Sequence, residues 1–549
     1  MTLFEKLLEA RGLTGPDREL FLSPSYDAKH DPFLLPDMQA AVDRLVGAHK
    51  NQERITIYGD YDIDGLTATT VLLDAFGSFG FENVTAFIPN RFVEGYGLTV
   101  EAIEKIAADG ANLIVTVDCG SLSEKEIVRA NELGVDVIVT DHHNVAPVQP
   151  PAVAVINPKR PDHNYPFIDL AGVGVAFKLI QALQTRLSGL PPGQEKWLLD
   201  LVALGTVCDV VTLVDENRAN VYWGLKVLAK TRRPGLKALM AVARVETEKV
   251  NARSLGFGLG PRMNAAGRLE TAQYALDMLR ADEGMAALEK AQLLDSLNMA
   301  RRSDQDKIFK AAVEQAEHYA DHPVLVVSHP DWNHGIIGIV AAKLLEKYQK
   351  PAFVLQELGE ESKGSARSYG DFSAADAIRS ADDIITKGGG HKLAAGVTLP
   401  TKNIEAFRQR VNDFYYASNL QNQAALLLPK EDVAIDDFTD LNEALIDQLA
   451  MLEPFGNGNP EPVLKVAGLL VMNQRRMGAE AQHVKLELRD GKNKSMQFIA
   501  FSAPPHFFVE PGETVTIWFQ PTLNEWQGRK SVEGRLLHLE MSVEAVLED

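Results

Sequence analysis

The sequence predicts an α/β protein with a parallel-sheet domain, a long helix, a second α/β domain and a C-terminal β-barrel. Short apolar runs alternate with helical stretches from about residue 54 to 210, which is typical of a mostly parallel sheet. Residues 285–322 contain neither Gly nor Pro, which favours one long helix. Short alternating runs with turn residues between them fill the last part of the chain, as in a small barrel or sandwich.

Length and composition limit the classes of protein that remain. The chain has 549 residues, 46% of them hydrophobic and 24% charged, which excludes a disordered or fibrous protein and allows three or four domains. No apolar run is long enough to cross a membrane, and the N-terminus lacks the apolar stretch of a secretory signal. Two cysteines suit a reducing, cytoplasmic location. The net charge of −20 argues at first against a nucleic-acid partner.

The first half of the chain divides into a leader and a sheet domain. Prolines break residues 1–50 into short helices, which we expect to form a leader packed on the core of the next domain. Residues 51–283 are predicted to form the parallel-sheet domain. Helical periodicity appears between its apolar runs, for example at 66–76 and 124–133. The predicted strands are 55–58, 84–88, 113–117, 135–140 and 153–156.

The second half begins with the predicted helix, residues 284–322, up to about 57 Å long at 1.5 Å per residue. It is either a rigid connector or a plain amphipathic surface helix; the first is favoured because a new α/β pattern begins just beyond it. That second domain covers 323–415, and an acidic linker region follows at 416–462. The C-terminal domain is predicted at 463–549, with strands at 484–488, 496–501, 515–519 and 531–537.

Four apolar elements of the sheet domain each end in acidic or histidine residues. In an open parallel sheet, ligands bind outside the carboxyl ends of the strands, so these side chains can converge. A single Asp after a strand is usually a helix cap, but four such endings with paired histidines predict a shared metal site. The residues are Asp60, Asp62, Asp64, Asp118, Asp141, His142, His143 and Asp209.

The chemistry of this set fits two divalent ions, Mn²⁺ or Mg²⁺, because carboxylates with one or two imidazoles suit these metals. Asp62 and Asp64 can face different ions, while Asp118 can bridge both. Two ions about 3.5–4 Å apart can activate a water and stabilise the leaving oxygen of a phosphoryl displacement.

Three other known motifs are excluded because the sequence has the wrong residue at a required position. DYDIDG starts like an EF-hand loop, but Val71 stands at its twelfth position, where a Glu is required. GVGVAF at Gly172 lacks the third glycine of a dinucleotide fingerprint, and GGGHKLAAG has Leu393 where a P-loop needs Ser or Thr. Cys119 and Cys208 adjoin proposed ligands and are either soft metal ligands, redox sensors or small buried residues. The last is favoured because neither cysteine has the sequence spacing of a thiolate metal site.

GDYDIDG, VDCG, DHH and a later CD, in that order, resemble the four motifs of the DHH phosphoesterases. GSARS at 364–368 and GGGHKLAAG at 388–396 resemble the second domain of that superfamily, called DHHA1. Four longer motifs resemble the branch of single-strand-specific 5′→3′ DNA exonucleases, and the match runs from about residue 30 to the C-terminus. They are IPNRFVEGYGL at 88–98, GLGPRMNAAGRL at 258–269, SHPDWNHGIIGIVAAKL at 328–344 and LEPFGNGNPEPV at 452–463.

The resemblance implies roles for individual residues. The implied metal ligands are Asp62, Asp64, Asp118, His142 and Asp209. The implied catalytic residues are Asp118 and His142 together with Asp60 and His143, which lie beside the ligands; His143 is positioned to contact the scissile phosphate. The implied DNA-contacting residues are Arg91, Arg262, Asn264, Arg268, Trp332, His334, Ser365, Arg367, Gly389 and His391.

Physical reasons accompany some of these roles, and alternatives stay open. Arginine suits phosphate because it binds in a bidentate manner and keeps its charge, although a single Arg is more often a surface ion-pair residue. The backbone around Gly389 either approaches a phosphate or forms a tight turn, and His391 favours the phosphate. Trp332 either stacks on a base or belongs to the core or a lid.

The last segment resembles an OB-fold. Its basic residues occur near Trp518, Phe519 and Trp526, which fits single-strand binding; the alternative is an ordinary strand surface over core aromatics.

The resemblance implies a metal-dependent exonuclease that degrades single-stranded DNA 5′→3′ to 5′-mononucleotides, in DNA recombination and repair. Two alternatives are a DHH phosphodiesterase acting on short oligonucleotides or cyclic dinucleotides, and a non-catalytic replication scaffold. The expected partners are single-stranded DNA, a helicase and a single-strand-binding protein, and the chain is expected to be a monomer. A protein that is acidic overall but has local basic groups is then expected to bind a single strand threaded into its site better than the surface of a duplex.

Overall fold

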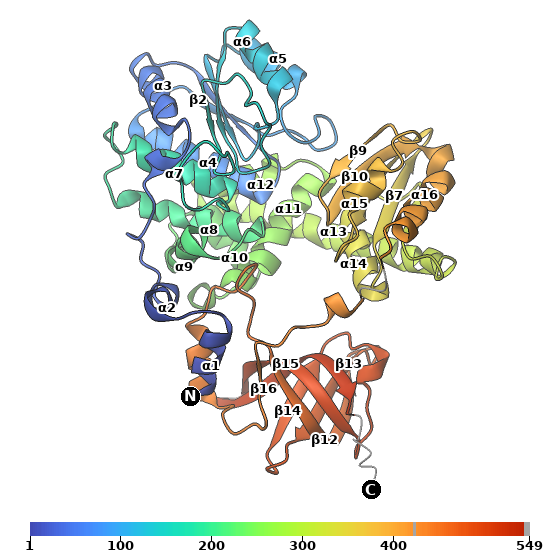
Figure 1. The fold of residues 1–549 in the computed structure, drawn as a ribbon. Helices are drawn as coiled ribbons and strands as arrows, with labels where there is room; N and C mark the ends of the chain where they lie inside the picture. The colour runs from blue at the N-terminus through green and yellow to red at the C-terminus, as the bar shows by residue number, and fades with distance from the viewer. Residues whose placement is uncertain (421–423, 527, 543–549) are drawn as a thin grey trace.

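The computed structural model describes residues 1–420, 424–526 and 528–542. Three β-sheets mark three folded units, with the sheet domain at the top of Figure 1, the second α/β domain at its right and the barrel below. Residues 543–549 of the predicted C-terminal domain, and the side chain of Trp526, lie outside the described part. Within that part, no helix is long and apolar enough to cross a bilayer.

The first sheet has the order β2-β1-β3-β4-β5, and every neighbouring pair is parallel, as predicted. The direction of winding reverses between β1 and β3, which makes the carboxyl ends of these two strands the expected ligand site. β1 and β3 are buried along their whole length, which explains their continuous apolar runs. The strands are β1 Ile55–Gly59, β2 Val84–Phe87, β3 Leu113–Val117, β4 Asp136–Thr140 and β5 Ala154–Ile156.

Helices cover both faces of this sheet (Figure 1). One face packs on α5 Val100–Ala108 and α6 Glu124–Glu132. The other face forms the largest core, with helices that pack on one another away from the sheet. The helices of this core are α3 Met38–Lys50, α4 Ile63–Phe79, α7 Gly172–Leu183, α8 Leu199–Cys208, α9 Asp215–Leu228, α10 Pro234–Val242, α11 Gly260–Leu269 and α12 Gln273–Leu279.

The predicted long helix is one continuous element, α13 Gly284–Glu317, about 51 Å long at 1.5 Å per residue. Ala291 and Leu294 lie in the core of the sheet domain, and Ile308 and Ala312 lie in a core of the second domain. The helix is therefore a connector held at both ends, and one side of it is buried in spite of its many charges.

The second domain has a mixed sheet in the order β6-β7-β8-β10-β9, in which only β6 and β7 are parallel. One face packs on α14 and α13, and the other on α15 and α16. The elements are β6 Leu325–His329, α14 Ile337–Tyr348, β7 Ala352–Leu358, β8 Glu361–Arg367, α15 Ala374–Arg379, β9 Lys387–Gly390, β10 Ala394–Pro400 and α16 Ile404–Ala417.

The C-terminal sheet closes into a five-stranded barrel because β12 pairs with both β13 and β15. The sequence did not indicate β12, which twists through polar residues and a register shift. Phe519 is fully buried in the barrel's core, as the alternative had it, whereas Trp518 is 7% exposed and lies against Lys465 and His538 outside that core. The strands are β12 Leu464–Met477, β13 His483–Arg489, β14 Ser495–Ala500, β15 Thr514–Trp526 and β16 Arg529–Met541, with β11 Val433–Ala434 beside β12.

Two expectations about packing need correction. The leader does not pack as a whole on the next domain, because helix α1 Leu3–Ala10 buries its apolar face in the barrel's core, whereas α3 packs on the sheet domain (Figure 1). The region predicted as a linker also joins this core, through Phe438 and helix α17 Glu443–Ala450. An amphipathic pattern shows that a helix has an apolar face to bury, but it does not show which domain covers that face.

We expect Leu7→Ala to destabilise the barrel by about 3 kcal/mol, because Leu7 is fully buried in its core. Hydrogen exchange should then increase in β12 and α17 but not in the first sheet. Lys6→Ala, on the exposed side of the same helix, is the matched control. Increased exchange in the first sheet instead would contradict this packing.

Candidate active site

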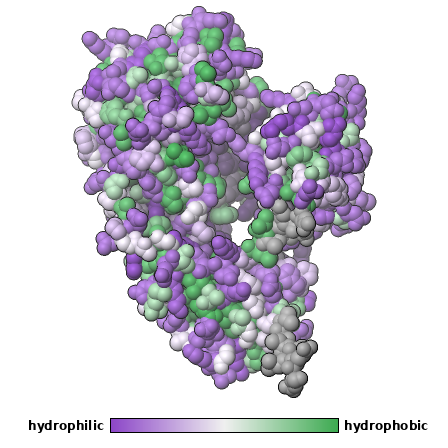
Figure 2. Space-filling model, viewed as in Figure 1, coloured by the Kyte–Doolittle hydropathy of each residue, from purple (hydrophilic) through white to green (hydrophobic). Residues whose placement is uncertain are grey.

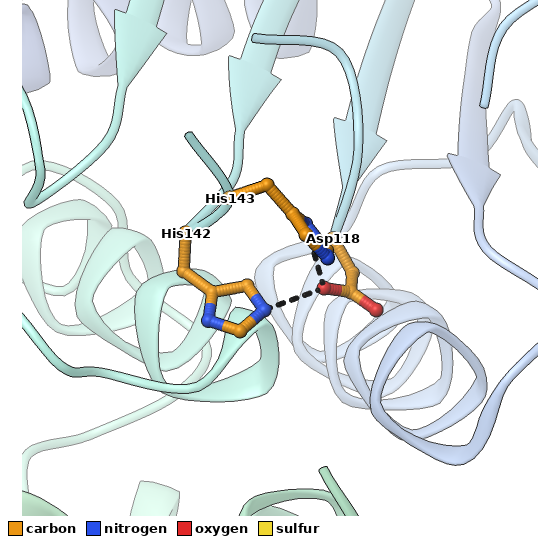
Figure 3. A group of neighbouring side chains, drawn as sticks. All are labelled: Asp118, His142 and His143. Atoms are coloured by element: carbon orange, nitrogen blue, oxygen red, sulfur yellow. Dashed lines mark ion pairs between the residues drawn. The ribbon is translucent and has the colours of Figure 1, made fainter. Parts of the chain in front are cut away.

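The carboxylates and histidines predicted from the strand ends do converge at the switch point between β1 and β3. His142 lies at the centre, with Nε2 3.0 Å from Asp118 Oδ1, 3.4 Å from Asp209 Oδ2 and 3.8 Å from Asp64 Oδ2. Figure 3 shows both histidines directed at Asp118 from the segment after β4. Residues from four separate elements thus share one small volume.

Within the described residues, the ligand atoms form three overlapping groups, each with its atoms within 4.8 Å of one another. The groups are Asp60–Asp62–Asp118, Asp64–His142–Asp209 and Asp118–His142–His143. Asp118 and His142 each belong to two of these groups, so both side chains are shared between neighbouring sets of ligand atoms.

The local backbone explains why these side chains point inward. Asp62 caps α4 and accepts the N–H of Gly65 at 3.0 Å, which leaves its second oxygen free of the helix. Asp118 has a φ of 62°, a left-handed conformation that is uncommon outside glycine and that is often found at functional sites. The end of β3 therefore turns sharply, and the Asp118 carboxylate faces the cluster.

The N-terminus of α7 holds Asp64. Its carboxylate accepts the N–H groups of Gly172 at 2.6 Å and Val173 at 2.8 Å, which are free at the start of a helix. A Cβ on Gly172 would lie 2.7 Å from Asp118 Oδ1, so only glycine allows this approach. The GVGVAF motif, rejected as a nucleotide fingerprint, thus has a role in building the site.

Several polar atoms in the cluster are buried without a hydrogen-bond partner. They are both carboxylate oxygens of Asp118, one of Asp60 and Nε2 of His142. Buried polar atoms are normally satisfied, so such a set of acceptors indicates that the cluster is built to bind a cation. Oxygen and imidazole donors fit Mn²⁺ or Mg²⁺. The residues present therefore suit the divalent metals that the sequence predicts.

Burial and mutual repulsion raise the pKa of four carboxyl groups in the cluster. Burial and then the charge of Asp62 raise the pKa of Asp60 to about 8 and that of Asp64 to about 7. Burial and the charge of Asp64 raise the pKa of Asp209 to about 9, and the pKa of Asp118 rises well above its ordinary range. Burial and the charge of His143 lower the pKa of His142 to about 3, which keeps its imidazole neutral, as a metal ligand must be.

Asp141 organises the histidine pair, a role that sequence reasoning did not assign. It accepts the backbone N–H groups of His142 and His143, and its Oδ1 lies 2.9 Å from Nδ1 of His143. Burial alone would lower the pKa of His143, but the hydrogen bond and charge of Asp141 outweigh it and raise that pKa. A charged His143 beside Asp118 suits contact with a phosphate.

Neither cysteine belongs to any candidate metal group among the residues that the structure describes. Cys119 is buried beside the carbonyl of Tyr58, and Cys208 lies beside that of Leu255. This agrees with the interpretation of both as small residues packed behind the site.

A group of arginines from the sheet domain, α13 and the second domain surrounds Arg268, and one of them, Arg91, also acts on Asp60 of the cluster. Burial, and then the charges of Arg91, Arg301 and Arg367, lower the pKa of Arg268 to about 10, so each of these three arginines lies near Arg268. The guanidinium carbon of Arg91 lies 4.3 Å from the ring centre of Tyr61. Arg301 on α13 was missed, because an Arg beside Arg302 on a helix with many charges resembles an ordinary solvated surface.

The arginine group lies where the sheet domain meets the second domain. Arg268 donates to the carbonyl of Gly335 in the second domain at 3.0 Å. Gly338 leaves room for the side chains beside it: a Cβ there would lie 3.3 Å from Nη2 of Arg367 and 3.5 Å from Oγ of Ser365.

The remaining predicted contacts are more scattered. Arg262 pairs with Asp295 at 2.8 Å, and His334 Nδ1 lies 2.8 Å from Oε1 of Gln356. Trp332 is 4% exposed and stacks on His329, so it has the core position that was the open alternative and no face free for a base. Gly389 and His391 are exposed in and just after edge strand β9.

A cavity of about 630 Å³ adjoins the cluster between the three domains. It is lined by Cys208 and Val210 on either side of Asp209, by predicted Asn264, and by a loop at 453–461. Figure 2 shows the molecule hollowed between its domains. The lining includes four arginines, namely Arg253, Arg268, Arg301 and Arg535.

Comparison with known proteins assigns the same three units. The chain matches the DHH family, N-terminal domain, over residues 54–206, the DHHA1 domain over 321–417 and the RecJ OB domain over 432–538. The OB match begins inside the predicted linker region, in agreement with the packing of β11 and α17 on the barrel. Fold and site together define a metal-dependent DHH protein.

Curated relatives and solved structures narrow this class. The chain is 38% identical over 534 residues to the single-stranded-DNA-specific exonuclease RecJ of Bacillus subtilis, covering 96% of this chain and 66% of the relative. It is 35% identical over 526 residues to RecJ of Escherichia coli, covering 91% of this chain and 89% of the relative. The crystal structure of Thermus thermophilus RecJ in complex with Mn²⁺ superposes with a TM-score of 0.84 at 31% identity, over 98% of this chain and 76% of that one. The chain belongs to the RecJ family.

The raised pKa values predict how the metal-free protein responds to pH. The folded pKa values of Asp60, Asp64 and Asp209 lie above the ordinary 3.8, so the folded state binds more protons than the unfolded state. Their contribution to stability is therefore fully present below about pH 4 and is lost as pH rises through about 7 to 9. In EDTA, we expect the free energy of unfolding to fall across this range.

Mn²⁺ should reverse this trend, because it binds the deprotonated carboxylates of the folded state. At a concentration 100 times its dissociation constant, it should stabilise the protein by about 2.7 kcal/mol. Denaturant unfolding at pH 6 and pH 9, in EDTA and in Mn²⁺, measures both effects. Asp209→Asn should flatten the slope in EDTA. Identical pH slopes with and without Mn²⁺ would show that the cluster is not a metal site.

Proposed function

We propose that this chain is a metal-dependent exonuclease that degrades single-stranded DNA 5′→3′ to 5′-mononucleotides. The observation that carries the proposal is the set of overlapping carboxylate–histidine groups with unsatisfied oxygens at the sheet's switch point. Membership of the RecJ family supports it, since the relatives are named single-stranded-DNA-specific exonucleases. Related structures were solved with Mn²⁺ and with Mg²⁺.

Five residues would hold two divalent ions, namely Asp62, Asp64, Asp118, His142 and Asp209. Such ions supply an activated water and neutralise charge on the phosphate and the leaving oxygen. The protein's own groups orient the reaction. Asp118 lies between the ligand groups, and the N-terminus of α7 fixes Asp64.

His143 provides the contact to the scissile phosphate. Asp141 fixes the orientation of its ring and favours its charged form, and its Nδ1 lies 3.7 Å from Asp118 Oδ1. The side chain is partly exposed, so a phosphate can reach it. Asp60 is buried beside Asp62 and supports the negative potential of the site.

Polarity comes from the arginine group on the second domain's side. Arg91, Arg268 and Arg367, with Ser365, would bind the 5′-terminal phosphate, because guanidinium groups bind phosphate in a bidentate manner. The distance from this group to the metal cluster then selects the first phosphodiester bond. The three-domain cavity would carry the rest of the strand past Arg301 and Arg535.

Neither alternative function accounts for the structure as well. A phosphodiesterase for short oligonucleotides has no need of the barrel that walls the cavity through Gln520 and Arg535. A scaffold has no need of an intact ligand set, and all five ligands are present and converge.

We place the enzyme in DNA recombination and repair in the cytoplasm, as a monomer supplied with single strands by a helicase and a single-strand-binding protein. The hydrolysis of an unpaired strand requires that a duplex first be opened. Membership of the RecJ family supports this placement.

The proposal predicts mononucleotide release from 5′-labelled single strands in Mn²⁺, blocked by a bulky 5′ group but not by a bulky 3′ group. Asp118→Ala should lower kcat more than about 100-fold because it removes the bridging ligand. Asp109→Ala, an exposed helix-cap residue of the same domain, should leave the rate unchanged. Release of nucleotides from 3′ ends, or full activity of Asp118→Ala, would refute the proposal.

Arg367→Ala should reduce the preference for a 5′-phosphate over a 5′-hydroxyl strand at least about tenfold, since it removes charge-assisted hydrogen bonds to the phosphate. Competition between the two labelled strands measures this ratio. Arg379→Ala, an exposed arginine of the same domain, is the control. An unchanged ratio in Arg367→Ala would exclude this side chain from the terminal-phosphate site.

A further inference from the structure

Asp209 is the metal ligand that its own segment supports least. It caps the C-terminus of α8, where the helix dipole disfavours a carboxylate. The next residue, Val210, has a φ of 62°, a left-handed conformation that is costly for a β-branched side chain. Such a turn persists only where the surroundings hold it.

The contacts that hold this turn come from the C-terminal domain. Asn457 donates from its side-chain Nδ2 to the backbone carbonyl of Val210 at 2.9 Å. The backbone carbonyl of Asn457 accepts the N–H of Leu213 at 2.7 Å. The neighbouring glycines pack closely on the same turn. A Cβ on Gly456 would lie 2.6 Å from Cδ1 of Leu213. Residues 456–458 thus form a clamp on residues 210–213.

The clamp is itself firmly anchored. Arg218 of the sheet domain, 2% exposed, donates to the carbonyls of Leu452, Glu453 and Pro454. Asn459 donates to two of the same carbonyls. Arg11 of the leader donates to Asn459 at 2.9 Å and to the carbonyl of Pro460 at 2.9 Å. The loop therefore has a fixed shape when it meets the turn.

We propose that Asn457 is a positioning residue, through which the C-terminal domain holds Asp209 in its metal-binding place. The C-terminal domain then sets metal affinity in addition to contacting DNA. The proposal rests on the metal site alone, so it stands or falls separately from the nuclease assignment.

Titration calorimetry of the full-length, metal-free protein with MnCl₂ tests this directly. We expect Asn457→Ala to weaken Mn²⁺ binding about tenfold, the size typical for groups that orient a metal ligand. Gly456→Ala should do the same by pushing Leu213 away. Gly491→Ala, in the same domain with open space around its Cβ position, should bind Mn²⁺ like the wild type.

Activity provides a second readout. At limiting Mn²⁺, Asn457→Ala should have a lowered kcat that excess Mn²⁺ restores, with an unchanged KM for the single strand. A raised KM with unchanged calorimetric affinity would assign the loop to DNA binding and overturn the proposal. Wild-type Mn²⁺ affinity in both Asn457→Ala and Gly456→Ala would overturn it as well, whatever their melting temperatures.

Discussion

The structure depends on the burial of several carboxylates at one edge of a parallel sheet. Asp60, Asp64 and Asp118 are almost fully buried in one cluster, and burial raises the pKa of each. A protein keeps such repulsion only when a cation relieves it in the working state. The left-handed turn at Asp118, the N–H groups of α7 and the glycine at 172 all serve to place these oxygens.

Positive charge comes from three parts of the chain. The arginines around Arg268 come from the sheet domain, from α13 and from the second domain, and α13 spans the first two cores. The arginine group is therefore held in place by more than one domain. The chain's charge of −20 is compatible with DNA binding because its acidic site takes cations and its basic groups gather in a cavity.

The C-terminal barrel does more than extend the surface. The leader's α1 and the segment with α17 complete its core, and the loop at 453–461 returns to the turn after Asp209. Arg11 of the leader and the loop at 453–461 thus meet near this turn, a contact that accounts for the specific LEPFGNGNPEPV motif. Its glycines permit close approach to Leu213 and Thr212, and its asparagines make the hydrogen bonds.

The sequence by itself determined the parallel sheet, the long helix and the residues that gather in the carboxylate–histidine cluster, because apolar periodicity and the order of strand-end motifs are local properties. Only the tertiary structure decided the rest. Trp332 and Phe519 proved to be core residues, since burial depends on neighbours far along the chain. Arg301 and Asn457 gained roles from partners in other segments, with Asn457 contacting a residue 247 positions away. Such contacts leave no periodic signal, because folding rather than spacing brings their partners together.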